Sequence, residues 1–140
     1  MNIFAPDYGT KLLHMAEGGN ALAEDYTVQG KPGAGDKLYF GIIQAGVRVH
    51  AVQILSGAAG AGASVKVGFE PADNEDPRVA DDDYFIPAGA SLATAGAVSS
   101  ASLPITFDYP VKLVATVGAT AFANDTKLVA IVTGKVVGVL

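Results

Sequence analysis

The sequence predicts an all-β protein, an antiparallel β-sandwich with a jelly roll as the preferred topology. Seventeen glycines and seven prolines in 140 residues indicate many short elements joined by turns, not a helical bundle. From residue 37 onward, apolar residues recur at every second position in about seven to nine short segments, and no convincing long helix interrupts them. Without helical crossovers a parallel sheet is disfavoured. An immunoglobulin-like sandwich lacking its disulfide and tryptophan is the alternative topology.

The chain is expected to consist of an N-terminal arm, residues 1–34, and a single β-sandwich domain, residues 35–140. Half of the residues are hydrophobic and 16% are charged, which excludes disorder as the main state. The arm is rich in turn residues, and its stretch 11–17 suits either a short helix or an extended segment. The arm has too many apolar residues for a solvated tail. We therefore expect the domain, a sister subunit or a foreign surface to cover it.

The first two strands of the domain are expected at residues 37–43 and 47–55. Residues 37–43 are apolar on both faces, as in the centre of a sheet. In the second strand Arg48 and His50 point to one face, but Val52 and Ile54 then follow on that same face. One extra residue swaps the two faces of a strand, so the sequence predicts a β-bulge near Ala51.

The middle of the chain alternates between loops and short strands. Residues 57–63 form a flexible loop of glycine and alanine, and residues 64–70 form a strand with Val65, Val67 and Phe69 pointing inward. A short strand at residues 84–86 is expected to stop at Pro87. Residues 90–102 suit a weak strand or a loop.

The C-terminal third contains the clearest strands, at residues 112–117 and 127–132. Residues 103–109 alternate between apolar and polar positions, and the prolines at positions 104 and 110 mark this segment as an edge or a strand boundary. Residues 135–140 remain strand-like. An apolar C-terminus is expected to be docked, because a bare hydrophobic edge invites aggregation.

The charge is concentrated in one acidic segment. The formal net charge is −5, and residues 70–83 hold seven of the 14 acidic residues against the single Arg78. The nearly neutral remainder has no lysine or arginine cluster, which argues against direct nucleic-acid binding and against a polybasic membrane anchor. A solvated loop held open by repulsion is the favoured interpretation of the segment. Calcium binding by residues 73–76 with 81–83, or contact with a basic patch on a partner, are the alternatives.

The sequence offers little for catalysis, and we expect neither an enzyme nor a cofactor or metal site. The absence of cysteine excludes thiolate catalysis, disulfides and zinc–thiolate sites. The histidines, His14 and His50, lack a recognisable nucleophile motif around any serine. Residues 30–37 resemble a phosphate loop, but Asp36 and Lys37 stand where lysine and serine or threonine are required. A hydrolase on a jelly-roll scaffold, using His14 or His50, is the weakest hypothesis.

The aromatic residues fall into two groups. Phe40, Phe69, Phe85 and Phe107 occupy positions that alternation places in the core. Other aromatic and apolar residues suit contacts between chains, where aromatic anchors are enriched. These interface candidates are Phe4, Tyr8, Leu12, Leu13, Tyr26, Tyr39 and Leu140.

The N-terminus does not read as a secretory signal. Pro6 and Asp7 stand where a signal peptide needs apolar residues, and no run approaches the roughly 18 apolar residues of a membrane span. We therefore expect the chain to be made and kept in a cytoplasm, or assembled there into a larger structure.

From residue 35 to residue 140 the order of features resembles the small capsid decoration, or cement, proteins of tailed bacteriophages. The resemblance lies in the ordered whole, since no single motif is diagnostic. The matching segments are residues 35–40, 46–49, the glycine–alanine loop, 65–70, the acidic loop, 83–86, 111–118 and 127–132.

This resemblance implies a jelly-roll domain that coats the outside of a phage head. The implied partners are the major capsid protein and further copies of the chain, as a homodimer or alternatively a trimer. The implied location is the surface of a virion assembled in the host cytoplasm, with no catalytic residues to carry over. The alternative function is a glycan- or receptor-binding β-sandwich of a phage fibre or spike.

Overall fold

The computed structural model describes residues 2–5 and 21–138. All regular structure in this part of the chain is β-strand, and it contains no helix that could cross a membrane. The strands are β1 (Ile3–Phe4), β2 (Ala21–Gly30), β3 (Lys37–Ile43), β4 (Val47–Ser56), β5 (Ser64–Pro71), β6 (Asp81–Ser91), β7 (Gly96–Ser99), β8 (Ile105–Thr106), β9 (Val111–Val117) and β10 (Thr126–Val136).

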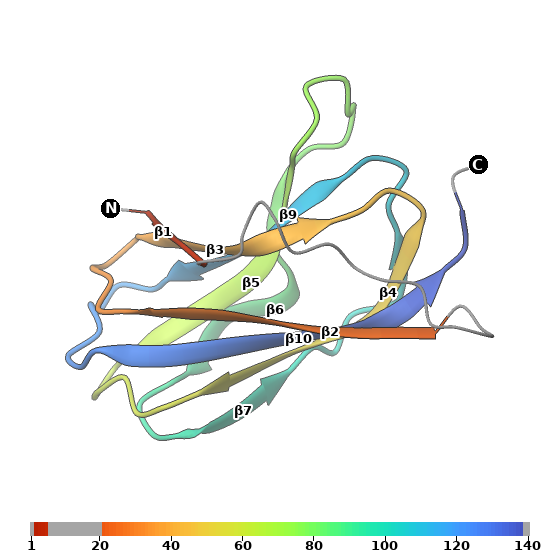
Figure 1. Cartoon of the computed structure of the whole chain (residues 1–140). Coiled ribbons are helices and arrows are strands. Elements are labelled where there is room, and N and C mark those ends of the chain that lie inside the picture. The colour runs from red at the N-terminus through yellow and green to blue at the C-terminus, as the bar shows by residue number, and fades with distance from the viewer. Residues whose placement is uncertain (1, 6–20, 139–140) are drawn as a thin grey trace.

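The strands form the two layers of a β-sandwich (Figure 1). One sheet has the order β1-β3-β9-β5-β6, and the other has the order β2-β10-β4-β7, with β8 pairing with β4. All pairings are antiparallel except that of β1 with β3. When the two-residue strands β1 and β8 are left out, the remaining eight strands can be numbered 1 to 8 along the chain. Their orders in the two sheets are then 2-7-4-5 and 1-8-3-6. This order is that of a jelly roll, so the predicted fold class is confirmed.

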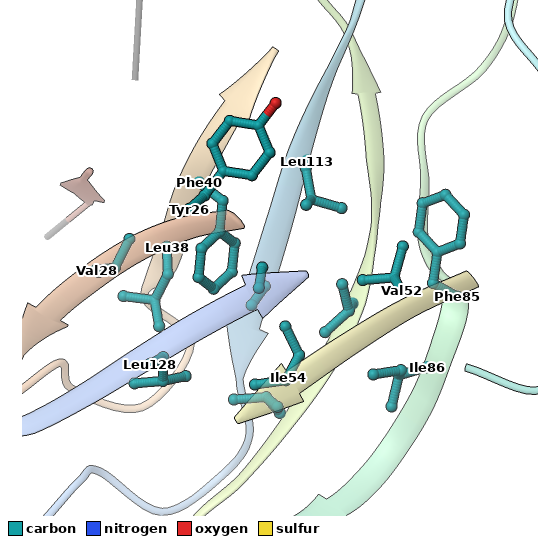
Figure 2. Packing of buried hydrophobic residues seen from close by; sticks show 14 of the residues in the cluster. Tyr26, Val28, Leu38, Phe40, Val52, Ile54, Phe85, Ile86, Leu113 and Leu128 are labelled. Atoms are coloured by element: carbon teal, nitrogen blue, oxygen red, sulfur yellow. The ribbon is translucent and has the colours of Figure 1, made fainter. Parts of the chain in front are cut away.

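The core fills the space between the two sheets (Figure 2). Alternate side chains of β5, β9 and β10 enter it, which is the period expected of a sheet with one buried face, whereas the edge strand β6 buries the neighbouring residues Phe85 and Ile86. Phe40, Phe69, Phe85 and Phe107 are at most 3% exposed, as their positions in the alternation predicted. Val65 and Val67 are equally buried on β5. The alternation was therefore a sound guide to the core.

Part of the expected N-terminal arm belongs to the sandwich. β2 pairs with β10 over ten residues, from Gly30 opposite Thr126 to Ala21 opposite Lys135. Tyr26 and Val28 of β2 are 1% exposed and lie in the core. Among the described residues, this sheet therefore includes Ala21–Gly30, which lie within the expected arm of residues 1–34. The possible helix at residues 11–17 lies outside the described residues.

The bulge predicted near Ala51 is present. Thr133 of β10 faces Ala51 of β4, and the next residue, Gly134, faces Val49, so His50 is the extra residue. Val47, Val49, Val52 and Ile54 are all buried as a result. Gly134 makes the close approach possible, because a Cβ at this position would lie 2.0 Å from the carbonyl oxygen of Arg48.

The strand expected to stop at Pro87 instead continues to Ser91. Proline is tolerated because β6 is the edge strand of its sheet. The ladder with β5 passes from Ile86 opposite Val67 to Ala90 opposite Val65, so residues 87–89 bulge outward. Gly89 has a φ of 98° in this bulge, a conformation that favours glycine.

The remaining expected strands and loops agree with the structure in part. The predicted strands at 112–117 and 127–132 are confirmed as β9 and β10. The segment 90–102 contains the short strand β7, and only Ile105–Thr106 of the segment 103–109 is strand. The glycine–alanine loop is anchored to the body, since Ala59 and Ala63 are buried and both hydrogen-bond to the backbone of Leu92.

Candidate interaction surfaces

The outer faces of the two sheets differ in charge. On the β1-β3-β9-β5-β6 sheet, the residues pointing away from the core include several lysines and carboxylates. We call this surface the charged face; its charged residues are Lys37, Lys66, Glu70, Asp82 and Lys112. On the β2-β10-β4-β7 sheet the central outward positions carry no charge. The two faces are therefore suited to different neighbours.

Tyr39 organises one end of the charged face. Its hydroxyl donates a hydrogen bond of 3.1 Å to Glu70 Oε1, while Lys37 Nζ donates one of 2.7 Å to Glu70 Oε2. Phe4 of β1 stacks on the Tyr39 ring at 4.8 Å, and Lys112 Nζ lies 5.7 Å from the ring centroid. The hydrogen bond from Lys37 to Glu70 raises the pKa of the lysine. The polar groups of Lys37, Tyr39 and Glu70 therefore have hydrogen-bond partners within the chain.

At the other end, the start of β6 folds over β5. Gly68 is buried, and a Cβ there would lie 2.0 Å from the carbonyl oxygen of Asp81. Lys66 Nζ forms an ion pair of 3.0 Å with Asp82 Oδ2. The side-chain hydrogen bond between Asp81 and Asp83, together with burial, raises the pKa of Asp81. The carboxylates of Asp81, Asp82 and Asp83 therefore lie close together, and Lys66 forms an ion pair with one of them.

The acidic segment does not behave as one open, self-repelling loop. At its tip, which projects beyond the sandwich (Figure 1), Asp73 and Asp76 accept hydrogen bonds from backbone amides two residues further on. Arg78 returns to the body, where its guanidinium lies 5.2 Å from the Phe107 ring and 6.0 Å from the Phe69 ring. The segment is therefore exposed to solvent or half-buried, as predicted, but Asp73, Asp76 and Arg78 hold it by specific contacts.

The calcium alternative required carboxylates from residues 73–76 and 81–83 to converge. In the described part of the chain, the carboxylates that converge are those of Asp81, Asp82 and Asp83, whose ligand atoms lie within 4.8 Å of one another. Asp82 already pairs with Lys66. The carboxylates of Asp73 and Asp76 cap turns in the loop instead. The two halves of the acidic segment do not join in one ligand set.

The other sheet carries what we call the uncharged face. Thr27, Val129, Leu55 and Ala97 lie side by side across β2, β10, β4 and β7, because each faces the next in the strand registers. Ile131, Gln53 and Ser99 form the adjacent row on β10, β4 and β7. Asp25 completes the second row on β2, where it faces Ile131, and lysines 127 and 135 lie towards the ends of β10. Leu55 is 38% exposed.

Two of the hollows on the described surface lie on or beside the sheets. One, of about 680 Å³, lies on the uncharged face between β4, β7 and β10; it is lined by Leu55, Ser56, Gly57, Gly96, Ala97, Lys127 and Val129. The other, of about 590 Å³, lies beside the bulge of β6 and has mainly backbone, alanine and glycine walls, with Lys66 and Thr116 as its larger polar side chains. Neither presents a set of groups arranged for catalysis.

The predicted interface residues occupy different environments. Phe4 is 52% exposed on the charged face, whereas Tyr39 beneath it is 7% exposed. Tyr26 is a core residue, packed with its ring against Gly41, and within the single chain it offers no surface to a partner. The other interface candidates, Tyr8, Leu12, Leu13 and Leu140, lie outside the described residues. So does His14, while His50 is exposed beside the bulge of β4.

The uncharged face carries no aromatic residue in the rows described above, so the aromatic residues of the sequence do not point to it. The available signal was the outward register of β10, where Val129, Ile131 and Thr133 replace the charged residues usual on a solvated strand face.

Comparison with known proteins adds a structural likeness. No family model matches the sequence, and no curated protein matches it. A chain in the capsid of Ralstonia phage GP4 is similar, with a TM-score of 0.74 at 15% identity over 96% of this chain and 97% of that chain. A chain of the cyanophage Pam1 capsid asymmetric unit has a TM-score of 0.66 at 17% identity, covering 88% and 89% of the two chains.

A chain of the acid-stable capsid of Helicobacter pylori bacteriophage KHP30 is also similar. Its TM-score is 0.54 at 20% identity, over 84% of this chain and 90% of that chain. These likenesses show a shared fold. Because each match covers most of both chains, the similar chains are of nearly the same length as this one and contain little beyond the same sandwich.

Proposed function

We propose that this protein is a structural component of a bacteriophage virion that binds the outer surface of the head and stabilises it by bridging subunits of the major capsid protein. The observation that carries the proposal is the near full-length match of its jelly roll to chains in three phage capsid structures. The order of sequence features, which resembles that of decoration proteins, supports the narrower part of the proposal. On this proposal the chain is made in the host cytoplasm and acts as a homo-oligomer, with a dimer favoured.

The surfaces of the chain support a binding role. Bridging requires a rigid body with contact patches, not reactive groups. The two packed sheets supply the body, while Phe4 and the uncharged face supply apolar patches on opposite sides of it. Many symmetry-related copies on one head make bridging effective even when each contact is weak. Phe4, stacked on Tyr39, is suited to anchor such a contact.

The proposal is tested by mass spectrometry of purified virions. We expect the intact chain in a fixed copy ratio to the major shell protein, and we expect protease added to intact virions to reach it. Detection only in infected-cell lysate, or a copy number of a few per particle, would contradict a role in coating the head. A few copies per particle would favour the fibre or spike alternative.

A further inference from the structure

We propose that the uncharged face of the β2-β10-β4-β7 sheet is the surface through which two copies of this chain form a dimer, stacking face to face about a two-fold axis. The inference deepens the proposed function, because it assigns a surface to the oligomer invoked there, but it can be tested on the isolated protein. Its basis is the composition, the shape and the size of this face.

The composition of the face fits a contact between identical chains. The cores of protein interfaces are depleted of charged residues, and homodimer interfaces are more apolar than other surfaces. The rows centred on Val129 and Ile131 satisfy this condition, while Asp25 and the lysines of β10 lie around them. The charged face has the opposite character, because burying its ion pairs Lys37–Glu70 and Lys66–Asp82 would require their desolvation.

The shape of the face fits its own copy. Leu55, the exposed large apolar side chain of this face, borders a hollow that is lined by the small residues Gly57, Gly96 and Ala97 together with Ser56, Val129 and, at its rim, Lys127. A projection beside a hollow is self-complementary under a two-fold axis, since the projection of each copy can enter the hollow of the other. Two-fold symmetry is also the commonest arrangement of soluble homo-oligomers.

The size of the face is sufficient for a specific contact. Three long strands and the short β7, at about 4.8 Å between strands and about 3.3 Å per residue, give a planar footprint of roughly 500 Å² per copy for the whole outer surface of this sheet, which includes the rim that carries Asp25, Lys127 and Lys135. Two copies would bury about 1,000 Å² in total, not counting the additional surface area of protruding side chains. This area is near the lower bound for a biological interface. We therefore expect a dimer of modest affinity in solution that a repeating surface would reinforce.

The test compares two alanine-to-arginine variants in edge strands of opposite sheets. Ala97→Arg places a charge on the uncharged face, and Ala88→Arg places the same charge on β6; both alanines are exposed, so both variants should fold. Sedimentation equilibrium should find a wild-type dimer, an Ala88→Arg dimer of unchanged affinity, and an Ala97→Arg dimer weakened about a hundredfold or more. Circular dichroism would confirm that both variants keep the β-fold.

Three results would overturn the inference. A wild type that stays monomeric at high concentration removes the dimer. A dimer that persists equally in Ala97→Arg places the contact elsewhere. A monomeric wild type whose binding to phage heads is lost in Ala97→Arg and kept in Ala88→Arg assigns the face to the shell protein. Conversely, a dimer that Ala97→Arg disrupts but that does not bind heads would uphold the inference while the proposed function fails.

Discussion

Gly134 and Gly68 are required by backbone contacts between strands. At each position a Cβ would lie 2.0 Å from a carbonyl oxygen of the neighbouring strand, that of Arg48 beside Gly134 and that of Asp81 beside Gly68. Because backbone atoms cannot rotate away as a side chain can, any larger residue forces the strands apart. The first contact closes the bulge of β4, and the second lets β6 cross the charged face.

We predict that Gly134→Ala lowers the free energy of unfolding by about 2 kcal/mol or more, because the new methyl group clashes with the strand opposite. Chemical denaturation measures the change. Gly33→Ala is the matched control, since its Cβ would meet nothing closer than 3.5 Å and its φ lies outside the left-handed region. Equal stability of the two variants would show that the bulge is not closed in this way.

The ion pair of Lys37 with Glu70 predicts a pH dependence on the alkaline side. The hydrogen bond from Lys37 to Glu70 raises the pKa of the lysine above its ordinary value of 10.5. A raised lysine pKa contributes stability that is fully present below about pH 10.5 and is lost as the pH rises through the higher folded value.

Replacing this lysine, as Lys37→Met, should therefore cost less than about 1 kcal/mol near neutral pH, because the pair is partly solvated. The difference from wild type should shrink above pH 10.5. Thermal unfolding of both proteins across the alkaline range measures it. A difference that stays constant throughout that range would mean that Lys37 acts only through packing.

At the scale of the elements, β6 is the strand that local sequence predicted least well. Its alternation ends at Pro87, but its path depends on contacts distant in sequence: the notch at Gly68, the pairing of Asp82 with Lys66, and the freedom of an edge strand to bulge. β9 and β10 were predicted correctly because each lies in the middle of a sheet, where burial and alternation agree. β2 was missed because its inward residues Tyr26 and Val28 alternate with polar residues over a short stretch within a segment rich in turn residues.

The crowded carboxylates at the start of β6 predict a stabilising substitution. The hydrogen bond with Asp83, and then burial, raises the pKa of Asp81, so the folded state binds this proton more tightly than the unfolded state does. When both groups are ionised their contact therefore opposes folding, and the penalty fades as the pH falls towards 3.8.

Asp83→Asn should increase the free energy of unfolding at pH 7 by about a few tenths of a kcal/mol, and so raise the unfolding temperature slightly; the effect is small because both carboxylates reach solvent. The gain should vanish below about pH 4 in differential scanning calorimetry. Asp108→Asn, at an exposed position on another segment, serves as the control and should change little. An Asp83→Asn protein less stable than wild type at pH 7 would show that the carboxylate makes a favourable contact.

At the scale of the whole molecule, the sequence was enough to predict the two-layer sandwich, the core phenylalanines and the bulge of β4. The surface patches were harder to predict from the sequence, because the exposure of an outward-facing residue depends on its neighbours on other strands. Phe4 was predicted to suit contacts between chains because it is aromatic, and its side chain is 52% exposed. The uncharged face becomes visible only when Leu55, Val129 and Ala97 are brought together from three strands.

Binding to phage heads tests the central claim most directly. Purified protein is added to mature heads that lack it, and sedimentation then measures the bound copies per shell protein. The proposed function predicts saturation at a fixed ratio and heads that withstand more heat or chelator before they release DNA. Protein that stays in the supernatant at every concentration, with heads no more resistant than before, would contradict it.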